Sequence, residues 1–265
     1  MKSSRRRFMK MAGIAALGFG VQPAIKAVAP AASDGHGTAM AFQKGPKALA
    51  AIQWGMVIDT RRFHGPEDLE PMIEACHKEH NVPHFNEVRH EIKWIWETHY
   101  HNAFPNNPHP YLSEEAEHRP YLVMCNHCEN PPCVRACPTK ATFKRESDGI
   151  VIMDMHRCIG CRFCMAACPY GSRSFNFKDP RLGLDEKEMN LKYPTRMKGV
   201  VEKCNFCAER LAEGRMPACV EASEGALVFG DLKDPDSEVR HMLRENFTIR
   251  RKQNLGTEPC VYYIV

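Results

Sequence analysis

The hydrophobic positions of the chain fall into short runs rather than into long periodic segments. Residues 149–155 form one such run and predict a short strand, with residues 141–144 as its expected partner. Residues 226–229 predict a further strand, and residues 236–244 have the spacing of one short helix. The stretch 176–199 contains proline and charged residues without periodicity. We therefore expect an α+β fold of short elements with long loops and insertions.

A longer apolar run lies near the N-terminus at residues 11–25, directly after the arginine-rich segment 4–10. This order is typical of a twin-arginine export signal, and the small residues Ala29 and Ala31 suit cleavage after Ala31. The run is shorter than the ~20 residues of a spanning helix. We interpret residues 1–31 as a signal peptide, with an uncleaved anchor and a basic tail as the alternatives.

Composition narrows the class of protein. Residues 1–31 contain six basic residues and no acidic one, which is more than the whole formal net charge of +4. The rest of the chain is slightly acidic, so a basic nucleic-acid-binding surface has no support. The mean hydropathy of -0.44 argues against a membrane protein. Thirteen cysteines in 265 residues are unusual and indicate either disulfides or metal binding.

Cysteine spacing decides between these two uses. Two tandem runs occur at residues 125–137 and 158–168, each ending in a cysteine followed by proline. The second has the spacing of the bacterial ferredoxin run, in which three cysteines bind one cubane and the fourth reaches the neighbouring cluster. Structural zinc sites usually consist of two separate cysteine pairs. Repeated triplets of closely spaced cysteines are not a pattern typical of disulfides. The predicted ligands are Cys125, Cys128, Cys133 and Cys168 for cluster 1, and Cys158, Cys161, Cys164 and Cys137 for cluster 2.

A third run lacks its last cysteine. It contains Cys204, Cys207 and Cys219, and Ser223 stands where the fourth cysteine of the frame would be. A decayed fourth copy lies upstream, because residues 56–76 align with 151–168 and retain one cysteine at the last position. In this copy Phe63 replaces the first cysteine.

Pairing the first and last copies explains both losses together. One complete ligand set is missing, including Phe63 and Ser223, and the other is intact. The intact set predicts cluster 3, whose ligands are Cys76, Cys204, Cys207 and Cys219. A three-iron cluster on the last three, with Cys76 unused, is the alternative. We therefore expect three [4Fe-4S] clusters, which leaves Cys260 without a ligand role.

The repeats divide the chain into six segments. The expected segments are a signal peptide at 1–31, a flexible lead-in at 32–50, a degenerate ferredoxin repeat with an aromatic insertion at 51–118, a double ferredoxin-like module at 119–175, a bridge and third cluster-binding repeat at 176–232, and a C-terminal tail at 233–265. Within the insertion, the aromatic and histidine residues 90–118 are expected to cover a cluster or form a docking face rather than bind metal.

Basic residues crowd the cysteine runs. They are Arg135, Lys140, Lys144, Arg145, Arg157, Arg162 and Arg173. A cubane with four thiolates is negative, so nearby cations stabilise its reduced form and raise its potential. A solvated basic face is the simpler alternative.

The motifs at 125–133, 156–169 and 203–211 resemble those of the exported electron-transfer subunits of polysulfide, tetrathionate and nitrite reductase systems. The decayed first repeat, the insertion 90–104 and Ser223 are similar to a narrower group, the periplasmic iron–sulfur subunits of sulfur-metabolising membrane complexes. The resemblance implies a periplasmic protein held at the membrane by its partners. Those partners would be a multi-span quinone-interacting subunit and a multihaem cytochrome c.

The leading hypothesis is therefore an electron relay between a quinone-interacting protein and redox partners in a respiratory complex, with no catalytic residues and no small-molecule substrate of its own. An electron-transfer subunit of an exported molybdenum reductase or hydrogenase is the alternative. An enzyme with one substrate-binding cluster would need an open iron, whereas every cluster here can be given four cysteines. A structural iron–sulfur module without redox traffic is the remaining hypothesis.

The arginine pair of the signal gives a direct test. Replacing Arg5 and Arg6 together by lysine should leave the protein in the cytoplasm, because the export machinery reads the arginines themselves. Fractionation followed by immunodetection measures this. Normal arrival of the doubly substituted protein outside the cytoplasm would contradict the signal assignment.

Overall fold

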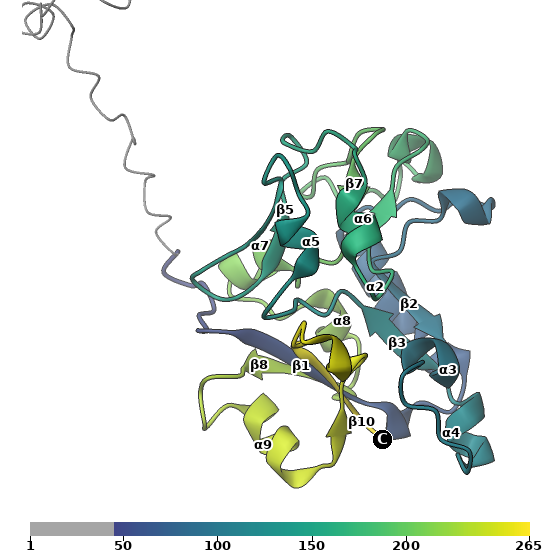
Figure 1. Cartoon of the computed structure of the whole chain (residues 1–265). Helices are drawn as coiled ribbons and strands as arrows, with labels where there is room; N and C mark the ends of the chain where they lie inside the picture. Colours follow the sequence, from purple (N-terminus) through teal and green to yellow (C-terminus); the bar gives the residue numbers. More distant parts are fainter. Residues whose placement is uncertain (1–44) are drawn as a thin grey trace, which may run out of the picture. The chain divides into compact units, whose positions relative to one another are not determined.

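The computed structural model describes residues 45–265, so the signal peptide at 1–31 and residues 32–44 of the lead-in lie outside the described residues. A four-stranded sheet of order β8-β1-β10-β9 forms the base of the fold (Figure 1). Strand β1 pairs antiparallel with β8 and parallel with β10, while β9 pairs antiparallel with β10. The strands are β1 (Trp54–Asp59), β8 (Leu227–Asp231), β9 (Thr248–Ile249) and β10 (Val261–Ile264).

Strand β1 is buried along its whole length, and its alternating side chains serve two cores. Met56 and Ile58 join the main core, whereas Val57 faces a smaller core beneath α9 (Glu238–Glu245). Val239 anchors α9 in that smaller core. Both faces of the central strand are therefore covered, which suits its run of apolar residues.

Three two-stranded hairpin-like sheets complete the strand pairing, and the helices between them are short (Figure 1). The pairs are β2 (Ile95–Thr98) with β3 (Tyr121–Met124), β4 (Thr142–Lys144) with β5 (Val151–Met153), and β6 (Ser174–Phe175) with β7 (Val201–Glu202). The helices before α9 are α2 (Glu70–Glu79), α3 (Tyr100–Ala103), α4 (Glu114–His118), α5 (Pro132–Arg135), α6 (Phe163–Ala167), α7 (Ala208–Ala212) and α8 (Ala218–Glu221). Single 3-10 turns are η2 (Thr60–Arg62), η3 (Pro66–Asp68), η4 (Val88–His90), η5 (Pro180–Gly183) and η6 (Gln253–Leu255).

Two helix pairs bring distant cysteine runs together. Helix α5 contains Cys133 and packs on α6, which contains Cys164. Helix α2 contains Cys76 and packs on α8, which contains Cys219. The second pair joins segments about 140 residues apart, and β1 pairs with β8 across about 170 residues. Packing of two distant segments therefore shapes this part of the fold.

The strand and helix predictions are confirmed where they rest on local pattern. The strand at 149–155 appears as β5 and pairs with β4 from 141–144, and the strand at 226–229 appears as β8. The helix expected at 236–244 appears as α9. The mixed α+β class is also as expected, and no helix among residues 45–265 is long and apolar enough to cross a membrane.

The description of residues 233–265 as a tail is wrong. Strand β10 lies between β1 and β9 in the main sheet, and its Val261, Tyr263 and Ile264 are buried. Four residues show no periodicity, and the parallel partner β1 lies some 200 residues away, so local sequence could not reveal the pairing. Part of the expected flexible lead-in is also packed, because the Leu49 N–H donates to the Leu211 carbonyl at 2.9 Å.

The role of β10 can be tested at two adjacent residues. Ile264 is 1% exposed in the smaller core and Val265 is 42% exposed. Ile264→Ala should lower the free energy of unfolding by about 2–5 kcal/mol through lost burial and a cavity, whereas Val265→Ala should change it by less than about 0.5 kcal/mol. Urea unfolding of the loaded protein, followed by circular dichroism, compares them. Equal effects would show that the C-terminal strand does not support the fold.

Candidate metal centres

The cysteines of the two tandem runs surround two small cavities. Cys168 from the second run lines the cavity of the first triplet, and Cys137 from the first run lines the cavity of the second. The structure thus gathers the two sets in the crossed arrangement that the spacing suggested. The first cavity is lined by Cys125, Cys128, Cys133 and Cys168, and the second by Cys137, Cys158, Cys161 and Cys164.

A left-handed residue recurs in each Cys-x-x-Cys turn. In the first such turn of each run it is the residue before the second cysteine: His127 has φ 41°, Gly160 has φ 70° and Phe206 has φ 55°. In the turn from Cys161 to Cys164 it is Arg162, with φ 64°. This conformation turns the chain sharply between the two cysteines. Glycine is required at 160 for a further reason, because an added Cβ there would lie 2.4 Å from the Gly199 carbonyl oxygen.

A third group brings Cys76 together with the cysteines of the last run. Cys76 on α2 lies close enough to Cys204, Cys207 and Cys219 that, after burial, their negative charges raise its pKa further. All four side chains are buried. Burial likewise raises the pKa of Cys219 to about 12. Four desolvated thiols at one place have high pKa values, which indicates that a bound cation is needed for them to ionise together.

The positions of the missing fourth set have become ordinary structure. Phe63 is 2% exposed and belongs to the main core. The Ser223 hydroxyl donates to the Val220 carbonyl at 2.7 Å and accepts from the Leu227 N–H at 3.1 Å. Its oxygen therefore stabilises the turn between α8 and β8, where the frame of the other repeats has a cysteine.

The first cavity has the donors that an iron–sulfur cluster requires. Four thiols line it, and no carboxylate is among its lining residues. The buried side-chain amide of Asn126 and the Arg173 Nη2 also line it, yet these polar atoms have no hydrogen-bond partner in the described part of the chain. Cluster sulfurs accept N–H bonds, so these donors suit a [4Fe-4S] group and the residues fit it.

The first cysteine group lies beside both of the others. Cys133 and Cys164 belong to one buried apolar cluster with Val151 and Val201, which joins the first and second groups. On the other side, burial and then the charge of Cys125 raise the pKa of Cys204. The rings of His127 and Phe206 stack with centroids 3.7 Å apart between these two loops. The three groups therefore form a row with the first in the middle.

The groups differ in their access to solvent. Every cysteine of the third group is buried, whereas Cys137, Cys158 and Cys161 of the second group are partly exposed. Ile159 is 67% exposed and Phe163 is 59% exposed on the second group's loop. The second group is accordingly the end of the row that is open to a partner.

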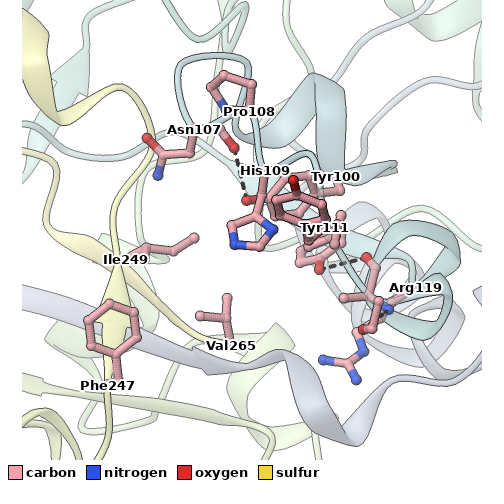
Figure 2. A pocket seen from close by; sticks show the side chains of 13 residues that line it. Tyr100, Asn107, Pro108, His109, Tyr111, Arg119, Phe247, Ile249 and Val265 are labelled. Atoms are coloured by element: carbon pink, nitrogen blue, oxygen red, sulfur yellow. Dashed lines mark hydrogen bonds between the residues drawn. The ribbon is translucent and has the colours of Figure 1, made fainter.

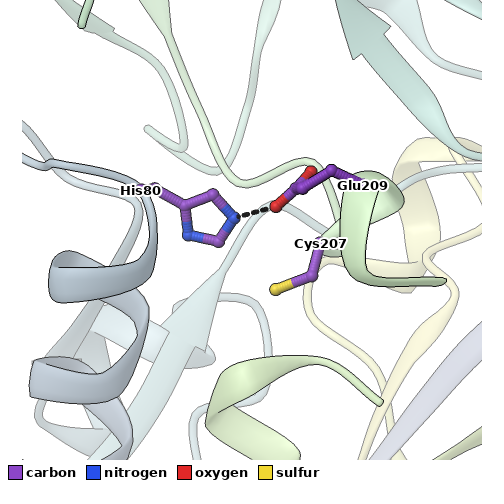
Figure 3. Close-up of side chains that lie close together, drawn as sticks. All are labelled: His80, Cys207 and Glu209. Carbon is purple, nitrogen blue, oxygen red and sulfur yellow. Dashed lines mark hydrogen bonds and ion pairs between the residues drawn. The ribbon is translucent and has the colours of Figure 1, made fainter. Parts of the chain in front are cut away.

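A buried polar network surrounds the third group, and sequence reasoning missed it. The His80 Nε2 lies 2.7 Å from the Glu209 carboxylate (Figure 3). The His80 ring stacks on Trp94 with ring centroids 4.5 Å apart. Its Nδ1 lies 2.9 Å from the Cys76 carbonyl oxygen. The one available signal is that His80 follows Cys76 by four residues at the end of α2. The network holds α2 against the loop of Cys207.

A buried ion pair extends this network. Glu202 accepts from the Arg196 Nε at 2.6 Å and from the Trp94 indole N–H at 2.9 Å, and both ionic side chains are at most 3% exposed. Arg196 also donates to the carbonyls of His80 and Asn81. Because the Glu202 carboxylate and the Arg196 guanidinium are both paired and hydrogen-bonded, they fix the geometry of this region without leaving an unpaired charge.

The aromatic insertion does not bring its own histidines together at a metal site. In the described residues, the one close set of three histidine, cysteine or carboxylate donors is His80, Cys207 and Glu209, within 4.8 Å of one another (Figure 3). The insertion instead contributes buried aromatics and one side of an open pocket of about 410 Å³ (Figure 2). Tyr111 and His109 face Phe247 and Val265 across that pocket.

Comparison with known sequences defines the class. Residues 120–182 match the family described as "4Fe-4S dicluster domain", which covers both tandem runs. This part of the chain is thus an iron–sulfur domain of the dicluster type.

Relatives along nearly the whole chain define the family. The chain is 43% identical to the "Hdr-like menaquinol oxidoreductase iron-sulfur subunit 1" of Archaeoglobus fulgidus, over 98% of this chain and 97% of the relative. It is 36% identical to the "Menaquinone reductase, iron-sulfur cluster-binding subunit" of Nitratidesulfovibrio vulgaris, over 80% and 89%. It is 32% identical to a tetrathionate reductase subunit of Salmonella typhimurium, over 100% and 89%. The chain belongs to this family of iron–sulfur electron-transfer subunits of respiratory oxidoreductases, and its role is electron relay rather than catalysis.

Proposed function

We propose that this subunit carries three [4Fe-4S] clusters, each held by four cysteines. The crossed placement of Cys137 and Cys168, together with the approach of Cys76 to the last repeat, is the observation that carries the proposal. When bound, each cluster takes up and releases one electron at a time. The proposed sets are Cys125, Cys128, Cys133 and Cys168; Cys158, Cys161, Cys164 and Cys137; and Cys204, Cys207, Cys219 and Cys76.

The fold is proposed to consist of four ferredoxin-like repeats in two nested pairs. The second and third repeats pair through α5 and α6, and the first and fourth through α2 and α8. The strand pairing supports the same correspondence. Strand β8, which follows the fourth repeat, pairs with β1, which precedes the first cysteine position of the first repeat. In the same way β4, which follows the second repeat, pairs with β5, which precedes the cysteines of the third. In this scheme, Phe63 and Ser223 mark the place of a ligand set that the outer pair has lost.

The row of cysteine groups suggests the path of the electrons. We propose the order cluster 2, cluster 1, cluster 3, because the first group neighbours both others. Exchange with a soluble or membrane-bound partner would take place at cluster 2, where Ile159 and Phe163 are exposed. Basic side chains at the same loops, among them Arg157 and Arg162, would favour an acidic partner surface.

The relatives suggest which partners these are. The names of two of them contain menaquinol or menaquinone, which supports a multi-span quinone-interacting membrane subunit as neighbour. The motifs that resemble DsrO, the periplasmic iron–sulfur subunit of a sulfur-metabolism complex, are the reason to propose a multihaem cytochrome c as a second partner. The proposed location is the periplasmic face of the membrane. The similarity to the tetrathionate reductase subunit supports the alternative, which is a subunit of an exported molybdenum reductase.

Cys76 provides the sharpest test of the cluster count, and Cys260 provides a matched control. Both thiols are 3% exposed, and burial raises the pKa of Cys260 to about 11. Cys76→Ala should convert cluster 3 to a three-iron cluster or lose it, with lower iron content and lower thermal stability, because this thiolate ties the first repeat to the last. Cys260→Ala should retain the wild-type iron content and spectrum. Iron analysis and EPR measure both.

Two results would count against the proposal. If Cys76→Ala kept the full iron content and an unchanged EPR spectrum, cluster 3 would have another fourth ligand. If Cys260→Ala lost a cluster instead, the ligand sets given above would be wrong, since the Cys260 sulfur lies 3.1 Å from the Gln53 amide nitrogen and neighbours Cys128.

A further inference from the structure

Arg173 is a buried cation without an anionic side chain beside it. The side chain is 4% exposed, and its Nη1 donates only to neutral groups, including the Thr142 hydroxyl at 3.2 Å. Its Nη2 has no hydrogen-bond partner in the described residues. A guanidinium remains charged at every relevant pH, and an uncompensated buried charge is strongly destabilising. Something in the loaded protein must therefore supply the negative charge.

The surroundings of Arg173 identify that charge as the thiolates of two cysteine groups. The Arg173 Nη1 lies 3.8 Å from the sulfur of Met153, which lines the second cavity together with Cys164. The guanidinium also lines the first cavity. It is therefore located where the first and second groups meet.

Lys203 is a second buried cation without a carboxylate partner, and it lies where the first and third cysteine groups meet. It is 2% exposed, and its Nζ donates to two carbonyl oxygens, those of Cys204 at 2.7 Å and of Val151. Val151 lines the first cavity, and Cys204 belongs to the third group. The ammonium thus lies between the first and third groups.

Two other buried cations of the described residues do have carboxylate partners. Arg196 pairs with Glu202 at 2.6 Å, and Arg210, which is 6% exposed in its side chain, pairs with Glu79 at 2.8 Å. Within residues 45–265, neither Arg173 nor Lys203 has a carboxylate at salt-bridge distance. Arg251, which is 4% exposed, also has no carboxylate at that distance, and its Nε donates to the Ala103 carbonyl oxygen at 3.0 Å. The position of Arg173 and Lys203 beside the cysteine groups is therefore what distinguishes them.

We propose that Arg173 and Lys203 are the buried counter-ions of the cluster row, Arg173 between clusters 1 and 2 and Lys203 between clusters 1 and 3. The inference rests on the proposed cluster assignment. Reduction adds a negative charge to a cluster, so a fixed neighbouring cation stabilises the reduced form and raises its potential. A cation between two clusters also weakens the repulsion between them, which keeps both reducible in succession.

The proposal predicts a position-specific pattern of potentials. Arg173→Met should lower the equilibrium constant for one-electron reduction of clusters 1 and 2 at least about tenfold, which corresponds to about 59 mV, and leave cluster 3 unchanged. Lys203→Met should lower that of clusters 1 and 3 and leave cluster 2 unchanged. Arg173→Lys should restore most of the loss. Redox titration of the full loaded chain, followed by EPR, measures this, with the cluster 3 signal identified as the one altered in Cys76→Ala.

The control is Arg244→Met, which removes an exposed cation on α9, where solvent screens its charge. It should change the equilibrium constant for reduction of each cluster less than about twofold.

Unchanged potentials in Arg173→Met, or equal shifts of all three clusters, would overturn the proposal. If Arg173→Met loses clusters that Arg173→Lys retains, charge is what the position requires and the proposal stands. If both lose them, guanidinium shape is decisive and the proposal fails. A wild-type chain with fewer than three clusters would instead refute the cluster assignment.

Discussion

The structure depends on one electrostatic constraint, the burial of many thiolates close together. Burial and mutual repulsion raise the pKa of Cys76 and Cys207 well above the ordinary value. Such thiolates become stable only when iron, backbone N–H groups or side-chain cations compensate their charge. The short helices and sharp left-handed turns around the cysteines are a consequence, because each segment serves to deliver a sulfur or an N–H rather than to build a long regular element. We therefore expect folding and cluster binding to be coupled.

The same constraint ties the ends of the described chain together. Cys76 near one end faces Cys219 near the other, and β1 lies between β8 and β10 in one sheet. The arrangement places the third cysteine group deep in the protein and leaves the second group near the surface. An enclosed group at one end and an accessible group at the other suit electron relay, which is the role of this family.

Cysteine spacing and local hydrophobic runs predicted a large part of the fold and of the candidate site. The β4–β5 pair and α9 could be predicted locally, and the alignment of Phe63 and Ser223 pointed to Cys76 across the chain. Strand β10 could not be predicted this way, because a run of four residues does not indicate a strand until its parallel pairing with the distant β1 is known. The His80–Glu209 contact was equally hidden, since it joins residues 129 positions apart. Contacts between distant polar residues leave no periodic signal in the sequence.

Stepwise reduction of the wild-type protein followed by EPR, on samples with measured iron and acid-labile sulfide, tests the proposed three-cluster row most directly. We expect three four-iron clusters, all reversibly reducible, with the signal of cluster 1 broadened by spin coupling to both neighbours in the fully reduced protein. Two clusters per chain, or a three-iron signal in the untreated wild type, would contradict it.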